Sequence, residues 1–138
     1  MTGDEIPLSG GNVNGGVVRV GNTVRRNSAP SSHLIHRLLQ HLEVKGFDGS
    51  PRFLGHDEKK REVLSFIEGQ VGIQTFAWES DDALTSAVRL LRRYHDCTVD
   101  FRAGVHDWAF VYPDVTKHEV ICHNDFGLYN LVYVNGRA

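Results

Sequence analysis

Three polar residues near the end of the chain, His123, Asp125 and Asn130, have the types and spacing that phosphoryl transfer requires. A carboxylate at Asp125 can accept the proton of an attacking hydroxyl, and the amide oxygen of Asn130 can bind Mg²⁺ nearby. The pattern His-x-Asp-x-x-x-x-Asn supplies both groups from one short loop. The alternative is a polar turn in which Asp and Asn serve only turn geometry.

The segments on either side of this loop are apolar. Residues 120–122 and 131–134 predict a strand before the loop and a strand after it. The second strand runs into Asn135-Gly136, a strong hairpin signal, and two residues remain beyond that turn to pair with it. The sequence therefore predicts a chain that is truncated at its C-terminus.

Length and composition bound the remaining possibilities. The chain has 138 residues, 41% of them hydrophobic, with 15 basic and 17 acidic side chains. This balance excludes a disordered chain and disfavours a nucleic-acid binder. The first residues lack a signal peptide and no apolar stretch is long enough to span a membrane, so we expect a cytoplasmic protein without a membrane partner. Cys97 and Cys122 are expected to be reduced thiols.

The N-terminal half predicts a sheet with one helix. Strands are expected at residues 6–8, 17–20, 23–26, 51–56 and 62–67. An amphipathic helix that stops at Gly46 is expected between the third and fourth strands. The first turn is rich in glycine, which lets backbone N–H groups approach a phosphate closely, although a flexible hairpin loop is the alternative. The candidate phosphate-binding residues in this turn are Gly10, Gly11, Asn12 and Asn14.

The C-terminal half begins after a polar connector. Residues 68–72 are predicted to be a hinge, and Ser80 is predicted to cap a second helix with acidic residues in its first turn. The predicted apolar face of this helix consists of Leu84, Ala87, Val88, Leu91 and Tyr94 or His95. Residues 98–116 show no clear periodicity.

Several segments together carry a family resemblance. Residues 8–14, 17–21, 61–69, 90–95 and above all 121–133 resemble the bacterial aminoglycoside phosphotransferase family of small-molecule kinases, which includes choline-kinase-like enzymes. A narrower similarity is to members labelled as trifolitoxin-immunity proteins. The resemblance implies an α+β, protein-kinase-like fold. A five-stranded antiparallel N-lobe with one helix would span residues 1–67, a hinge 68–72, and an incomplete, mainly helical C-lobe 73–138 with its catalytic loop at 123–130.

The resemblance also implies roles for individual residues. Asp125 would be the catalytic base, His123 would brace the loop, and Asn130 would bind Mg²⁺. Arg25 and the glycine-rich turn would hold the phosphates of ATP. The residues expected to face the adenine are Ser65, Phe66 and Ile67. The acceptor would be a hydroxyl of a small molecule.

The chain departs from the family pattern in several places. Arg25, or less well Arg26, stands where kinases use Lys, and the helix offers His33 and His36 where they use Glu. Asn124 stands in place of a usual Gly, and no acid follows Asn130 to serve as the second ligand of the Mg²⁺ ion. We therefore expect little catalysis from this chain. Two alternatives follow: a non-catalytic kinase-like binding or immunity protein, or a decayed gene fragment.

Overall fold

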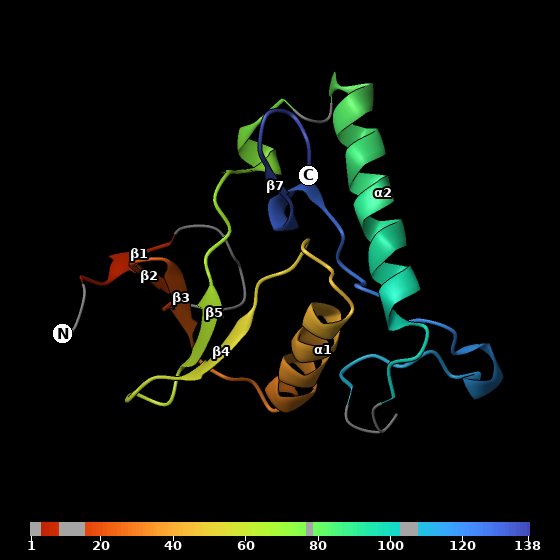
Figure 1. The fold of residues 1–138 in the computed structure, drawn as a ribbon, viewed down its shortest axis with the longest axis horizontal. Coiled ribbons are helices and arrows are strands. Elements are labelled where there is room, and N and C mark those ends of the chain that lie inside the picture. The colour runs from red at the N-terminus through yellow and green to blue at the C-terminus, as the bar shows by residue number, and fades with distance from the viewer. Residues whose placement is uncertain (1–3, 9–15, 77–78, 103–107) are drawn as a thin grey trace.

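The computed structural model describes residues 4–8, 16–76, 79–102 and 108–138. Its architecture is α+β, with a five-stranded antiparallel sheet, two α-helices and a separate two-stranded ribbon (Figure 1). The first helix lies between the sheet and the second helix (Figure 1). Among the described helices, none combines the length and apolar character needed to cross a bilayer.

The sheet is built from the five strands that the sequence predicts; the third has its predicted bounds and the other four are slightly shorter. They are β1 (Ile6–Pro7), β2 (Val18–Val20), β3 (Thr23–Arg26), β4 (Phe53–His56) and β5 (Glu62–Ser65). Their order in the sheet is β1-β2-β3-β5-β4, and every neighbouring pair is antiparallel. Gly21 supplies the positive φ of 58° in the turn between β2 and β3.

Helix α1 (Ser32–Val44) packs an apolar face toward the centre of the molecule. Leu38, Leu39 and Leu42 of this face form the main core cluster with Phe47, Leu64 and Phe101. The helix ends before Gly46, whose φ of 72° is the left-handed conformation expected at a helix C-terminus. The sequence predicted both the apolar periodicity and this glycine stop.

Helix α2 (Asp81–Thr98) begins as predicted at Ser80, whose hydroxyl accepts a hydrogen bond from the Ala83 N–H at 3.2 Å. The predicted apolar face was wrong in part. Ala83 and Ala87 are buried against Leu131 and Tyr133.

Two residues of the predicted face of α2 point away from the core. Leu84 is 62% exposed and Val88 is 55% exposed. The helix carries two apolar stripes, and periodicity alone does not choose between them. The stripe with alanines is buried because small side chains let the C-terminal ribbon approach the helix closely.

The C-terminal segments differ most from the sequence prediction. The predicted hinge contains β6 (Gln70–Val71), which pairs with β7 (Val132–Tyr133). Residues 120–122 form no strand. Short 3₁₀ turns occur at Gly72–Gln74, Val115–Lys117 and Leu128–Asn130. The Asn135-Gly136 turn is closed by an isolated β-bridge, in which Val134 and Arg137 exchange backbone hydrogen bonds of 2.9 and 3.1 Å.

A buried charged group joins α1 to the sheet. Glu62, 2% exposed at the start of β5, accepts a 2.5 Å hydrogen bond from Arg26 Nε on β3 through Oε1. Its other oxygen lies 2.5 Å from His36 Nε2 on α1. The His36 ring stacks on Phe53, with ring centroids 3.7 Å apart. A buried carboxylate is tolerated only with such partners.

We predict that Glu62→Ala lowers the free energy of unfolding by about 3 kcal/mol, because removing one member of a buried ionic cluster leaves the others unpaired. Urea denaturation measures this change. The control is Glu43→Ala, since Glu43 is an exposed acid of α1, 3.9 Å from Arg52 Nε. Its loss is expected to cost less than about 0.5 kcal/mol. Equal costs for the two variants would contradict the assignment of Glu62 as a structural anchor.

Candidate functional site

A cleft of about 2040 Å³ lies between α1 and the sheet on one side and α2 with the C-terminal segments on the other. Its lining is mainly apolar and includes Leu38, Leu42, Leu90, Tyr94 and Trp108. The predicted catalytic-loop residues also line it, so the structure brings the loop to the boundary between the two halves of the chain.

The loop is organised around the carboxylate of Asp125. Tyr129 Oη donates a short hydrogen bond to Asp125 Oδ1. Asn130 Nδ2 donates to Asp125 Oδ2 and to the Asp125 backbone carbonyl, both at 2.9 Å. His123 Nδ1 accepts from the Asp125 N–H at 3.3 Å. The three residues that the sequence singled out therefore lie together, although their roles in phosphoryl transfer stay predictions.

Asn124 gives the loop its shape. Its φ is 62°, in the left-handed region that most residues other than Gly avoid and that Asn tolerates well. This explains how Asn can stand where the family resemblance led us to expect Gly. The adjoining Asp125 and His123 are exposed, so the loop presents polar groups to the cleft.

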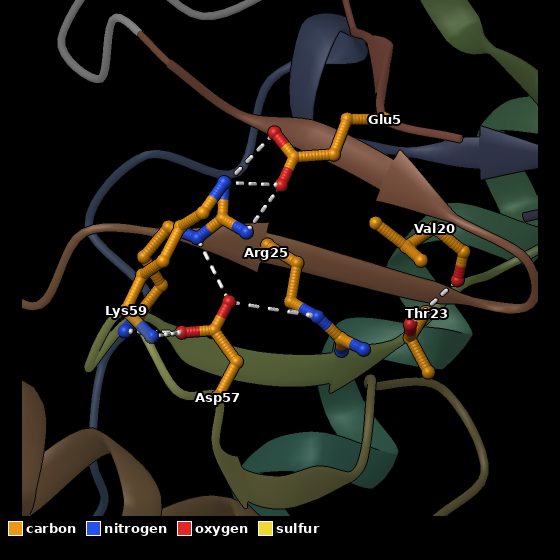
Figure 2. Close-up of polar contacts among 7 residues, drawn as sticks. Glu5, Val20, Thr23, Arg25, Asp57 and Lys59 are labelled. Carbon is orange, nitrogen blue, oxygen red and sulfur yellow. Dashed lines mark hydrogen bonds and ion pairs between the residues drawn. The ribbon is translucent and has the colours of Figure 1, made fainter. Parts of the chain in front are cut away.

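Arg25 belongs to an ion-pair network at the far end of β3 (Figure 2). Its Nε lies 3.8 Å from Asp57 Oδ2, and its side chain is 19% exposed. Asp57 also accepts from Arg61 Nε at 2.8 Å, and Arg61 and Lys59 both bind Glu5 (Figure 2). Arg25 therefore lies within ion-pair distance of a carboxylate but forms no hydrogen bond with it, and its Nη1 is buried without a hydrogen-bond partner among the described residues.

Arg26, the second candidate for phosphate binding, is bound to Glu62 and lines the cleft. Arg26 is therefore held by a buried carboxylate, whereas Arg25 only lies near one. The role of Arg25 in holding phosphates stays a prediction, as do the binding of ATP and Mg²⁺ and a hydroxyl acceptor.

Of the other residues predicted to bind the nucleotide, the structure describes three and leaves four outside the described ranges. Ser65 accepts a hydrogen bond from the Arg52 N–H at 2.7 Å. The Arg19 guanidinium lies over the Phe66 ring, with Cζ 3.7 Å from the ring centroid. Ile67 is 40% exposed and lines the cleft. The four residues of the glycine-rich turn lie outside the described residues: Gly10, Gly11, Asn12 and Asn14.

Sequence reasoning missed two contributors to this region. Glu62 was grouped with the fifth strand and given no role, because it ends a run of six charged residues, 57–62, and nothing in the sequence separates it from its more exposed neighbours. Tyr129 was also given no role. It lies four residues after Asp125, and at this spacing a single turn of the chain can bring the two side chains within hydrogen-bonding distance.

The Glu5 contacts predict a pH dependence of stability. Hydrogen bonds from Arg61 and then Lys59 lower the pKa of Glu5 from 4.5 to about 2. Between pH 2 and 4.5 the unfolded chain binds more protons than the folded chain does. The stability that the Glu5 contacts contribute is therefore complete above pH 4.5 and is lost as the pH falls toward 2.

We therefore expect Glu5→Gln to reduce the decline of unfolding free energy between pH 4.5 and 2, as measured by urea titrations at several pH values. Glu58→Gln is the matched control, because Glu58 lies on the same charged tip and forms no ion pair with any described residue. An identical decline in the wild type and the Glu5→Gln variant would rule out the proposed network contribution.

The conformation of Asn124 gives a second prediction. Asn124→Val should lower the free energy of unfolding by about 1–2 kcal/mol, because a β-branched residue is strained at positive φ. Asn124→Gly should be close to neutral. Chemical denaturation of both variants checks the difference, and a Val variant as stable as the Gly variant would contradict the left-handed conformation.

The chain is similar to a trifolitoxin immunity protein of Rhizobium leguminosarum bv. trifolii, with 38% identity over 139 aligned positions. The match covers 96% of this chain and 52% of the relative, so the chain spans about half the length of the curated relative it matches. No protein-family model matches the chain, and no solved structure matches it significantly.

These comparisons correct the family prediction. The assignment to the aminoglycoside phosphotransferase and choline-kinase-like family is wrong, since no family model of that kind matches and the relative is named for immunity. The label of a kinase is corrected for the same reason, whereas the binding of ATP by this chain stays a prediction. The name of the relative agrees instead with the narrower similarity to trifolitoxin-immunity proteins and with the immunity alternative.

Proposed function

We propose that the chain is an immunity protein that protects a cell by binding a trifolitoxin-like toxin, without a catalytic step. The observation that carries this proposal is the 38% identity to a trifolitoxin immunity protein along 96% of the chain. The relative is about twice as long as the matched region, so toxin recognition by this half is the part of the proposal that experiments must test.

The cleft supports a binding role. Its floor is formed by the apolar face of α1, and two aromatic side chains stand exposed along its lining: Phe110 at 81% and Tyr112 at 60%. Concave sites with apolar walls and a few polar groups are where proteins usually hold ligands. Exposed aromatic residues at such a site commonly supply much of the binding energy.

The charged residues favour binding over phosphoryl transfer. The Arg26 guanidinium is held by Glu62, and Arg25 lies 3.8 Å from Asp57. Phosphoryl transfer requires positive charge that is free to bind the phosphates. These contacts therefore support a site that recognises a ligand.

Protection in cells is the first test. We expect a trifolitoxin-sensitive strain that expresses the chain to grow at a trifolitoxin concentration that stops the same strain with an empty vector. The Rhizobium relative serves as the positive control. The proposal is contradicted if the relative protects and this chain, present in the cell as folded protein, does not.

Binding to the purified chain is the second measurement. Trifolitoxin should raise its melting temperature, because a ligand that binds only the folded state stabilises it. Phe110→Ser should weaken binding roughly tenfold, whereas Val44→Ser, at an 85% exposed position outside the cleft lining, should leave it unchanged. A rise in melting temperature with ATP and Mg²⁺ but not with the toxin would contradict a binding-only function.

A further inference from the structure

Most charged side chains that line the cleft are already neutralised by neighbours. Those with an ion pair are Arg26, Lys117, Arg93 with Asp48, and Glu68 with Arg19. The lining residues that form no ion pair with another described residue are Asp125, Glu119, Arg137 and Arg102, which donates to backbone carbonyls. Two of these are acidic and two are basic, so a preference for a charged ligand depends on the local surroundings of each group.

Asp125 differs from the turn-forming aspartates of this chain. The carboxylate of Asp57 accepts the backbone N–H groups of Lys59 and Arg61, and that of Asp114 accepts the Thr116 N–H. Such contacts are the usual reason for Asp in a turn. No backbone N–H of the described chain binds the Asp125 carboxylate. Its position is not explained by turn geometry.

The groups that hold Asp125 are neutral. Tyr129 and Asn130 each donate one hydrogen bond to a different carboxylate oxygen. The hydrogen bond to Asp125 also raises the pKa of the Tyr129 phenol, which therefore remains a donor. The two neutral donors fix the orientation of the carboxylate but leave its charge uncompensated. Each carboxylate oxygen can still accept a further hydrogen bond.

The size of the cleft limits the class of ligand. Sites for small molecules typically measure roughly 300–1,000 Å³, and this cleft measures about 2040 Å³. Its apolar walls and the exposed Phe110 and Tyr112 suit apolar side chains spread along an extended ligand. A peptide segment fits this combination of size and chemistry better than a single small molecule.

We propose that the cleft takes an apolar peptide segment and that Asp125 receives a cationic side chain of that segment, Arg or Lys, between the hydroxyl of Tyr129 and the amide of Asn130. This deepens the proposed function, since the peptide would belong to the toxin that the cleft binds. Guanidinium and ammonium groups supply the charge-assisted donors that the free acceptor sites of Asp125 lack. Asp125 is therefore a residue that determines specificity.

The test uses four pools of fluorescent heptapeptides with random apolar residues around a fixed central residue. The central residue is Arg, Lys, Glu or citrulline, which has the shape of Arg without its charge. Fluorescence polarisation with the wild-type chain should show the Arg and Lys pools binding at least about tenfold more tightly than the citrulline pool, and the Glu pool least tightly.

Variants then identify the receptor. Asp125→Asn should bring the Arg pool to the level of the citrulline pool, whereas Asp114→Asn should keep the preference, because Asp114 contacts only its own turn and Lys117. The inference is overturned if Asp125→Asn retains the preference, or if Glu119→Gln removes it.

Two further outcomes separate this inference from the proposed function. Hexylguanidinium alone binding as tightly as the Arg pool would overturn the peptide assignment. Undiminished protection against trifolitoxin by a folded Asp125→Asn variant would overturn the role of Asp125 and leave the immunity function standing. A charge-dependent peptide preference in a wild-type chain that gives no protection would overturn the immunity function alone.

Discussion

The buried carboxylate of Glu62 is the contact on which the arrangement of the N-terminal half depends. It binds Arg26 on β3 and His36 on α1, so one side chain of β5 ties the helix to the sheet. A buried charge in this position is stable only while both partners stay in place. The contact is therefore directional, whereas apolar packing is not. The leucines of α1 consequently face the cleft and the main core.

The second constraint is the close packing of the β6–β7 ribbon. A Cβ at Gly72 would lie 2.8 Å from the Leu128 carbonyl oxygen and 2.7 Å from the Tyr133 ring, so only glycine permits this approach. The contact places the turn that carries Tyr129 and Asn130 beside residues 68–72. The segment predicted as a hinge thereby supports the groups that hold Asp125 in place.

The same residue spacing can serve recognition or catalysis, and the neighbouring charges decide between the two. The His-x-Asp pattern with Asn130 predicted a base and a metal ligand, whereas the structure has Tyr129 and Asn130 bonded to the carboxylate of Asp125. Arg26 of β3 is paired with the buried carboxylate of Glu62, and Asp125 in the cleft forms no ion pair with another described residue. Together with the similarity to an immunity protein, these contacts favour capture of a ligand.

The sequence by itself determined the local elements: the five strands, the two helices, the Ser80 cap, the Gly46 stop and the proximity of Asp125 to Asn130. Each depends on neighbours within a few residues. Only the tertiary structure decided which stripe of α2 is buried, that β6 pairs with β7, and that Glu62 meets His36. Those contacts join residues far apart in the chain, and periodicity carries no information about such partners.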